Sequence, residues 1–454
     1  MTYNLNVNNS INNLSPLDGR YSEKVSDITI LFSEKALIKK RFIIEVEWLL
    51  FILNESFYKT IKISKADIKK INVFKNSFDD SYAKKIKTIE NRTNHDVKAV
   101  EYFINEFLKK NNKEKFIPYV HLGLTSEDVN SLAYALMIKE VTEASIISIT
   151  DLDKKIKSLA SKYKKISFLA RTHGQPASPS TIGKEILVFH QRLQRQIHQA
   201  KSVIPMAKWG GATGNYHTIH LANQKRDPVK IATKFLKKFN VHHNAVTTQI
   251  EPHDWIAETC HVLIRINNII NDLNKDMWMY IANDIFIVKA IKNEVGSSTM
   301  PHKINPIDFE NSEGNVGLAN SMFNFFAEKL PISRLQRDLS DSTSLRNIGV
   351  AFGYSVIAYK STINGLNKIS PNKKKINEEL DNNWIVLSEA VQTVMRLENI
   401  DNAYEKLKEL TRGKGLDQEK YLEFIKSLKI SNKNKEYLLN LTPHNYIGVA
   451  TKLK

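Results

Sequence analysis

Two long stretches without glycine or proline constrain the fold of this chain more than any other feature of its sequence. The first runs from Glu127 to about Lys165, and the second runs from Trp255 to about Ile291. Glycine and proline are the strongest helix breakers, so each stretch predicts a helix far longer than the usual ~8–20 residues. At ~1.5 Å rise per residue, the first would be on the order of 55 Å long. Such helices are typical of long bundles.

The remaining pattern also favours an all-α fold. Apolar residues at helical spacing predict further helices over about 26–58, 65–87, 179–203, 228–239, 307–330 and 344–366. Neither an alternating strand pattern nor an internal repeat is evident. We expect three domains: a helical domain over 1–118, a central long-helix bundle with catalytic loops over 119–368, and a small helical domain over 369–454. Long helices with broad apolar stripes commonly need partners, so we expect an oligomer.

The charge of the chain leaves three explanations open. The net charge is +18, although the hydrophobic share of 42% and the charged share of 25% are ordinary. A nucleic-acid binder, an enzyme for polyanionic substrates and a lysine-rich composition would each produce this charge. Lysine is spread over every region and Asn and Ile are abundant, which favours compositional bias.

The compartment is indicated by what the sequence lacks. Cys260 is the single cysteine, so the chain cannot form an internal disulfide, which fits a reducing compartment. The first residues contain neither a basic n-region nor an apolar h-region, and no apolar run approaches the ~20 residues that span a bilayer. We therefore expect a cytoplasmic protein without a membrane partner.

One loop concentrates chemical groups. The segment from Gly296 reads Gly-Ser-Ser-Thr-Met-Pro-His-Lys-Ile-Asn-Pro and ends at Pro306. Its two prolines disfavour helix, and a helical pattern with Glu310 in its first turn follows from Ile307. Adjacent hydroxyls, a His, a Lys and an amide within nine residues indicate a functional loop. The alternative is an ordinary solvated connection.

This segment resembles the signature of the fumarase/aspartase superfamily of fumarate-releasing lyases, Ser-Ser-x-x-Met-Pro-x-Lys-x-Asn. His302 after the proline is similar to the adenylosuccinate lyase branch, of the bacterial type. Other stretches resemble the same branch, from the N-terminal Ser-Pro-Leu-Asp-Gly-Arg-Tyr ending at Tyr21 to the Tyr-Ile-Gly ending at Gly448. One departure is the Lys-Trp-Gly-Gly-Ala-Thr-Gly segment from Lys208, where Gly-Ala-Val-Gly is usual, and its bulky Trp209 is expected to alter loop packing.

The resemblance implies an elimination that releases fumarate. Ser297 would be the general base, and His173, in Arg-Thr-His-Gly-Gln-Pro-Ala, would be the general acid. Glu310 would hydrogen-bond His173 and fix its tautomer. Lys303 would support the charge of the base. His95, in an Asn-His-Asp-Val stretch whose Asn94 we interpret as a helix N-cap, is the alternative acid or a positioning group.

The resemblance also implies a set of substrate contacts. Those for the phosphate are Arg20, Tyr21, Arg337, Ser342 and Arg346, with Thr343, Ser344 and Leu345 in the same segment. Those for the succinyl group are Thr125, Ser126, Gln249, Lys303 and Asn305, and further substrate contacts are Asn94, His95, Asp96, Ser298 and Asn311. Taken alone, each polar residue of this set is interpreted as an ordinary surface residue, and only the joint fit to the family pattern favours a binding role.

The implied function is a lyase of purine biosynthesis, acting on adenylosuccinate and on the succinylated carboxamide ribotide SAICAR. The implied assembly is a homotetramer with sites shared between subunits. No cofactor or metal is expected: the thirteen histidines lack ligand spacing, and no phosphate-cradling Gly-rich loop or dinucleotide fingerprint is present. Two alternatives remain: a sister enzyme of the superfamily whose substrate lacks a phosphate, and a non-catalytic nucleic-acid binder or scaffold on the same fold.

Overall fold

The computed structural model describes residues 12–55, 62–222, 224–290, 300, 303–405, 407 and 416–453. Ser297 and Ser298, the predicted base and its neighbour, lie outside the described residues. The described chain is mostly helical, and its strands are two or three residues long. The predicted all-α class is therefore confirmed.

The chain divides into two compact units, which we describe separately. The first unit comprises Met1–Ser148, Gln196–Asn268 and Gly314–Ala358, and the second comprises Ile149–Arg195, Ile269–Glu313 and Tyr359–Lys454. This division differs from the three predicted domains in its boundaries. The three-domain description stays a prediction.

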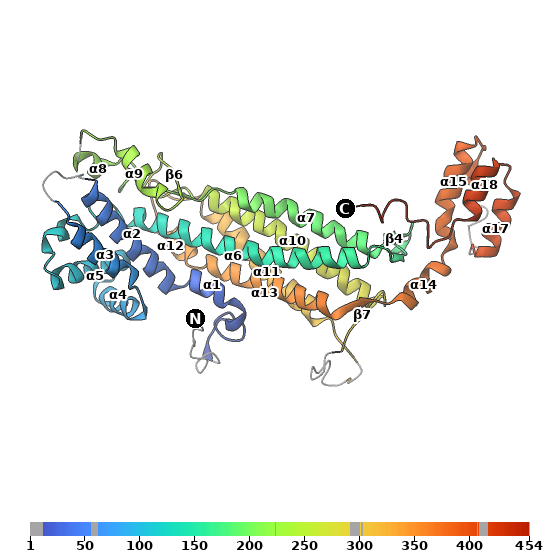
Figure 1. Cartoon of the computed structure of the whole chain (residues 1–454), viewed down its shortest axis with the longest axis horizontal. Helices are drawn as coiled ribbons and strands as arrows, with labels where there is room; N and C mark the ends of the chain where they lie inside the picture. The colour runs from blue at the N-terminus through green and yellow to red at the C-terminus, as the bar shows by residue number, and fades with distance from the viewer. Residues whose placement is uncertain are drawn as a thin grey trace. The chain divides into compact units, whose positions relative to one another are not determined.

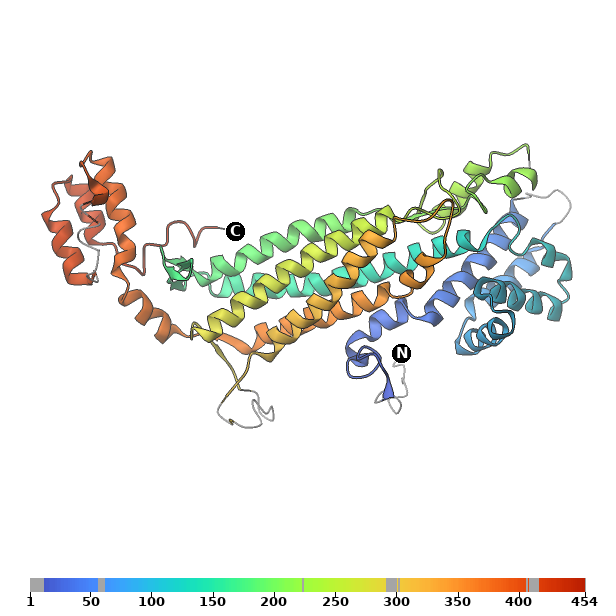
Figure 2. The same cartoon turned by 180° about the vertical axis from the view of Figure 1, so that it is seen from behind.

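Five long helices contribute to both units. They are α6 (Ser126–Lys162), α7 (Ile182–Ser202), α10 (Asp254–Ala282), α11 (Ile307–Lys329) and α13 (Ile348–Lys368). Within each unit, their segments run alongside one another (Figure 1 and Figure 2). Their inward residues are apolar and fully buried, among them Leu132, Leu152, Leu193, Ile266 and Phe323. Removing such side chains from water is the main force that holds helices together.

The second long stretch is helical over a shorter range than predicted. α10 ends at Ala282, and the prediction that it continues to about Ile291 was wrong. β7 (Phe286–Val288) instead pairs antiparallel with β8 (Ile369–Pro371). Ile, Phe, Ile and Val occupy 285–288, and such β-branched and aromatic side chains fit a pleated strand. Asp284, at a φ of 59°, turns the chain between helix and strand.

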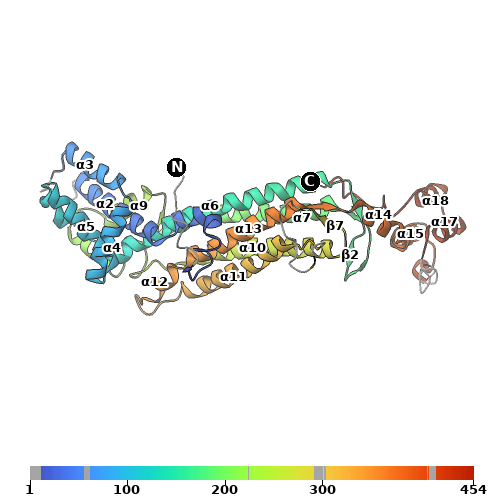
Figure 3. The ribbon, with the colours of Figure 1, turned by 90° about the horizontal axis from the view of Figure 1, so that it is seen from below.

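Seven helices that lie wholly in the first unit surround an aromatic core at its N-terminal side. They are η2 (Ser22–Val25), α1 (Ser26–Leu31), α2 (Glu34–Asn54), α3 (Lys65–Asn76), α4 (Asp80–Thr93), α5 (Asp96–Lys110) and η3 (Glu114–Tyr119). α2 to α5 gather in one cluster (Figure 3), and Phe74 stacks on Phe107 with ring centroids 3.6 Å apart. The predicted helix over 26–58 is two helices, because the Ser33 side chain accepts the Ala36 N–H and starts α2 anew.

The rest of the first unit is less regular. It holds α8 (His217–Ala222), α9 (Pro228–Lys237) and α12 (Ser340–Leu345), with β5 (Met206–Ala207) parallel to β6 (His242–His243). In the second unit, β1 (Ser167–Phe168) pairs with β4 (Ser180–Thr181), and β2 (Arg171–Thr172) pairs with β3 (Gln175–Pro176).

A small helical cluster closes the second unit. Its elements are α14 (Lys373–Asp381), η4 (Trp384–Leu387), α15 (Ser388–Leu397), α17 (Gln418–Ser427) and α18 (Asn432–Leu439). Leu387, Met395, Tyr421 and Leu438 form its buried centre. None of the described helices combines the length and apolar character needed to cross a membrane.

Candidate active site

The N-terminal turn is formed as predicted. The Gly19 N–H donates to the Ser15 carbonyl (3.1 Å), and the Tyr21 N–H donates to the Pro16 carbonyl (2.8 Å). Arg20 is exposed, and its guanidinium carbon lies 5.9 Å from the centre of the Tyr21 ring. The turn therefore presents a cation and a phenol together.

The Asn-His-Asp segment begins α5, but with a different cap from the predicted one. Asn94 ends α4 in the left-handed conformation (φ 52°), which Asn tolerates better than most residues. His95 is the N-cap of α5, and its Nδ1 accepts the Lys98 N–H at 3.2 Å. The neutral ring must then carry its proton on Nε2. About half of the His95 side chain is exposed.

Asp96 joins two arginines that are far from it in sequence. Its Oδ2 lies 2.8 Å from Arg41 and 2.9 Å from Arg346. Burial raises the pKa of Asp96, but the two guanidinium groups and the Val97 N–H outweigh burial and hold the pKa below its usual range. Arg346 also contacts Glu34 at 2.6 Å. Of the predicted residues, the structure thus brings Asp96 and Arg346 together.

The segment before Arg346 forms the short helix α12. Ser342 and Thr343 are at least partly exposed, whereas Ser344 and Leu345 are 8% and 2% exposed. A substrate contact from Leu345 would therefore use its backbone.

Thr125 and Ser126 begin α6, and a buried ion pair lies directly behind them. The Asp128 carboxylate accepts the Thr125 N–H (2.8 Å) and the Gly211 N–H (3.2 Å). Lys208 lies 2.9 Å from Asp128, with both side chains fully buried, and also donates to the Gly211 carbonyl (2.7 Å). This network ties the start of α6 to the glycine-rich loop.

Trp209, which we expected to alter the packing of that loop, lies in an aromatic cluster. The ring is fully buried and packs against Trp48 and Phe235, with ring centroids 5.3 and 4.6 Å away. The aromatic side chains of α2 and α9 thus accommodate the large residue.

Gln249 and Arg337 meet on the other side of the α6 start. The Arg337 guanidinium donates to Glu127 at 2.8 Å and to Gln249 at 3.3 Å. Gln249 donates in turn to the Ala212 carbonyl at 2.9 Å. Glu127 is 2% exposed, and burial raises its pKa although Arg337 opposes the rise.

In the second unit, His173 occupies the tip of a two-residue hairpin between β2 and β3. His173 and Gly174 both have positive φ, 54° and 75°, which is the pattern of the type I′ turn that suits hairpins. A non-glycine residue in this region is uncommon and often marks a functional site. The neighbouring Arg171 lies 3.1 Å from Glu379, and the His173 side chain is exposed.

The described part of the motif loop continues into α11. Lys303 is exposed and Asn305 is half-buried. Glu310 lies in the first turn as predicted, and its Oε1 accepts the Trp278 indole N–H at 3.1 Å. The Asn311 side chain accepts from Ser361 at 2.7 Å. The predicted pairing of Glu310 with His173 stays a prediction.

Several residues of the site escaped prediction. Arg41, Glu127, Asp128 and Lys208 are charged yet nearly fully buried. A charge inside an otherwise apolar helical stripe, as at Arg41 in α2, is the signal that could have found them, because buried charges require partners.

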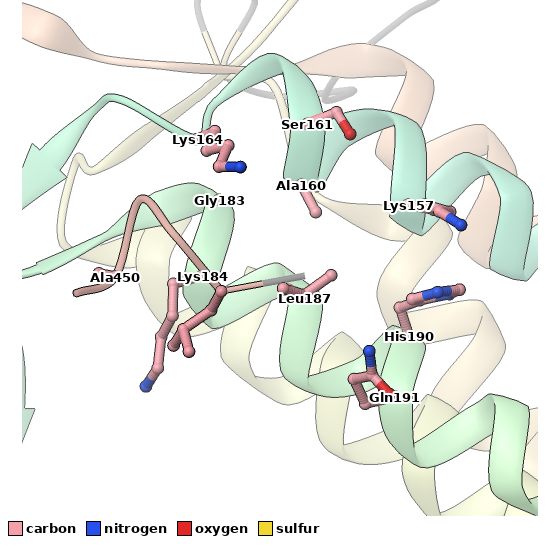
Figure 4. A pocket seen from close by; sticks show the side chains of 11 residues that line it. Lys157, Ala160, Ser161, Lys164, Gly183, Lys184, Leu187, His190, Gln191 and Ala450 are labelled. Carbon is pink, nitrogen blue, oxygen red and sulfur yellow. The ribbon is translucent and has the colours of Figure 1, made fainter.

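A cavity lies in the second unit, against the end of α6 and the start of α7. It has a volume of about 450 Å³ and is lined by residues of α6 and α7, including Lys157, Lys184 and His190, by Lys164 in the turn after α6, and by the C-terminal Ala450 and Leu453 (Figure 4). None of the predicted site residues that the structure describes lines it. Among the described residues, no group of three or more His, Cys, Asp or Glu side chains is arranged to hold a metal ion.

Comparison with known proteins identifies relatives over nearly the whole chain. A family described as "Lyase" matches residues 19–319, and one described as "Adenylosuccinate lyase C-terminal" matches residues 333–447. The adenylosuccinate lyase of Buchnera aphidicola subsp. Schizaphis graminum is 47% identical over 98% of each chain. Those of Legionella pneumophila (strain Corby) and Escherichia coli (strain K12) are 46% identical over 98% and 97% of each chain.

Solved structures share the fold at much lower identity. A fumarate lyase from Mesorhizobium sp. BNC1 superposes with a TM-score of 0.75 at 15% identity, covering 94% of this chain and 96% of that one. A 3-carboxy-cis,cis-muconate lactonizing enzyme from Pseudomonas putida has a TM-score of 0.70 at 17% identity, covering 94% of both chains.

Proposed function

The chain belongs to the adenylosuccinate lyase family, and on this premise we propose that Ser297 and His173 are the base and the acid of its reaction. The enzyme is a lyase that releases fumarate from adenylosuccinate in purine biosynthesis, leaving AMP. We further propose SAICAR as a second substrate, because it carries a succinyl group on nitrogen and a phosphate, as adenylosuccinate does. The proposed reaction uses no cofactor.

The elimination makes three chemical demands. A proton leaves the carbon beside one succinyl carboxylate, the resulting charge must be stabilised, and the departing nitrogen must be protonated. A positioned acid or base contributes about 10²–10⁴-fold each. Donors that are preorganised at the developing charge often contribute the most.

His173 is proposed as the acid. Its exposed ring at a constrained hairpin tip can reach a ligand without rearrangement of the backbone. Histidine titrates near neutral pH, so it can protonate the leaving nitrogen and regain its proton from solvent. Glu310 is proposed to fix its tautomer, and His95, whose side chain is about half exposed, is the alternative acid or a positioning group.

Ser297 is proposed as the base. A hydroxyl is a weak base, so its anion must be stabilised by donors in a site that excludes water. Lys303 and Asn305, which follow it in the same loop, are proposed to supply that field, and Ser298 is proposed to contact the substrate.

The observation that carries the binding proposal is the convergence of residues distant in sequence. Asp96 lies against Arg346, 250 positions later, and Gln249 lies against Arg337, 88 positions later. Arginine forks suit the phosphate of the nucleotide. We propose that the phosphate end of the substrate is bound by Arg20, Tyr21, Arg337, Ser342, Thr343, Ser344, Leu345 and Arg346. The succinyl end is proposed to be bound by Thr125, Ser126, Gln249, Ser298, Lys303 and Asn305. Further contacts are proposed for Asn94, His95, Asp96 and Asn311.

We propose that the active form is a homotetramer whose sites take residues from more than one subunit. Apolar side chains remain exposed on the long helices, for example Leu318 and Phe325 on α11 at 52% and 50% exposure. Such residues at helical spacing are typical of a face that packs against another copy.

Fumarate absorbance in a steady-state assay tests this function with adenylosuccinate and SAICAR as separate substrates. We expect Ser297→Ala and His173→Ala each to lower kcat by at least about 10³-fold while circular dichroism stays unchanged. Near-normal kcat in Ser297→Ala would show that another group is the base. If adenylosuccinate is turned over and SAICAR is not, SAICAR is excluded as a substrate, and the proposed catalytic roles are unaffected.

A further inference from the structure

We propose that Asn274, Ser312 and Thr362 form a hydrogen-bonded ring that holds Glu310 and Asn311 in position for catalysis. The three are positioning residues, since they act through those two neighbours. The inference rests on the proposed function, from which the roles of Glu310 and Asn311 are taken.

The ring joins three helices of the second unit through their side chains alone. Asn274 on α10 donates to the Ser312 hydroxyl on α11 at 2.8 Å. The Ser312 and Thr362 hydroxyl oxygens are 2.9 Å apart, and Thr362 on α13 donates to the Asn274 carbonyl at 2.9 Å. Asn274 is 1% exposed, and Ser312 and Thr362 are 0% exposed.

The donor order around the ring is consistent in one direction. The Thr362 hydroxyl gives its hydrogen to the Asn274 carbonyl, so Ser312 is the donor toward Thr362. The amide of Asn274 then completes the cycle at Ser312. In a closed cycle each hydrogen bond polarises the next, and in a buried setting an unmatched member is costly. The ring therefore permits one register of the three helices and penalises others.

Each of the four residues before Ser312 contacts one of the two neighbouring helices, α10 or α13. Asp308 lies 2.9 Å from Lys368 on α13. Glu310 accepts from Trp278 on α10, one turn beyond Asn274, and Asn311 accepts from Ser361, beside Thr362.

Phe309, the remaining residue of the four, packs its ring against α13. It is 2% exposed, and it packs so closely on Gly365 of α13 that a Cβ there would lie 2.7 Å from its ring. The first turn of α11 is thus fixed residue by residue, where the predicted catalytic loop ends.

The polar side chains of the ring fix the register of the helices, which apolar side chains would not do. Apolar packing would bury the same area, but it tolerates small shifts of one helix along another. Buried polar groups are best attested as devices that select one register. A shift of about 1 Å at a catalytic group can cost on the order of 100-fold in rate. The ring is therefore argued to serve catalysis more than stability.

The same three helices carry a matched polar cluster for comparison. Asn267 on α10 donates to Asn320 on α11 (2.9 Å) and to Ser355 on α13 (3.1 Å). Asn267 and Ser355 precede Asn274 and Thr362 by seven residues, which is two helical turns. This cluster belongs to the first unit and does not adjoin the first turn of α11.

The test replaces the ring by apolar side chains in one variant, Asn274→Leu with Ser312→Ala and Thr362→Val. Removing every partner together leaves no unmatched donor, so we expect the thermal midpoint to stay near that of the wild type. We expect kcat for adenylosuccinate to fall about 10–100-fold, with a smaller change in KM. A folded triple variant with the kcat of the wild type overturns the proposal.

A pair of single variants decides the matter if the triple variant does not fold. Thr362→Ser keeps the hydroxyl and is expected to keep kcat, whereas Thr362→Val removes it and is expected to lower kcat. Equal kcat in the two overturns the proposal. In the control, Asn267→Leu with Ser355→Ala, we expect an unchanged kcat, and a loss as large as that of the ring variant would show a general effect of helix packing.

Glu310→Gln separates this inference from the function on which it rests. An unchanged kcat in Glu310→Gln overturns the role proposed for Glu310. A lowered kcat there, combined with an unchanged kcat in the triple ring variant, overturns the ring proposal alone.

Discussion

The His121 ring lies between two carboxylates, with its Nδ1 2.6 Å from Glu45 and 3.9 Å from Glu101. Burial disfavours the charged ring, but the carboxylates of Glu45, Glu101 and Asp128 together outweigh burial and raise the pKa of His121 from 6.5 to about 9. A raised histidine pKa stabilises the fold fully below about pH 6.5, and that contribution is lost as pH rises through about 9. Between pH 6.5 and 9, we expect the deprotonation of His121 to lower the free energy of unfolding by on the order of 3 kcal/mol.

Urea unfolding of the wild type and of His121→Gln at pH 6.5, 8 and 9.5 measures this contribution. The stability gap between the two proteins should be largest at pH 6.5 and nearly closed at pH 9.5. His444→Gln is the control, since His444 pairs with Asp381 at the surface (2.8 Å), where an ion pair adds little. A gap that is equally wide at all three pH values would refute the role of the His121 charge.

Single residues also show where prediction from sequence reached its limit. The sequence predicts that the segment containing Asn94, His95 and Asp96 starts a helix, and it does, but the N-cap is His95 and not the predicted Asn94. Local preference favours Asn as an N-cap, but Asn94 is instead the C-cap of α4, where it adopts the left-handed conformation. The partners of Asp96 could not be predicted, because Arg41 and Arg346 approach it only in the folded chain.

Among the elements, α11 and α13 make a close contact at Phe309 and Gly365. A Cβ at position 365 would lie 2.7 Å from Phe309, which is buried and cannot withdraw into solvent. We expect Gly365→Ala to lower the free energy of unfolding by about 1–3 kcal/mol, although alanine favours helix more than glycine does. Denaturant unfolding at constant pH measures the change.

The neighbouring Asn364 is the control for that substitution. It is exposed on the same helix, so Asn364→Ala introduces the same residue without a clash, and a gain of a few tenths of a kcal/mol is expected from helix propensity. A Gly365→Ala variant as stable as Asn364→Ala would show that α11 and α13 can separate at no cost.

The helices themselves were largely predictable, for a physical reason. The stretch from Glu127 lacks helix breakers and keeps its apolar period, and α6 spans Ser126–Lys162 as these local rules require. α10 ended early because its continuation, Phe286–Val288, finds a strand partner in Ile369–Pro371. That pairing joins segments about eighty residues apart, and local periodicity carries no information about such a partner.

For the whole molecule, the decisive question is whether one site uses residues of different chains. Ser297→Ala retains an intact His173, and His173→Ala retains an intact Ser297. If a site draws these two residues from different subunits, a mixed oligomer contains some sites with both residues intact. Random mixing of equal amounts then predicts about a quarter of the wild-type activity, although each variant alone is inactive.

The experiment unfolds the two inactive variants together, refolds them, and measures fumarate release against each variant refolded alone. Ser297→Ala mixed with the doubly substituted Ser297→Ala/His173→Ala chain is the control, and it must stay inactive because no chain supplies Ser297. If both residues of a site come from one chain, no mixture can restore activity. Mixed oligomers that form, as judged by a tag on one variant, and yet release no fumarate would therefore exclude the shared site and leave each subunit with a complete site of its own.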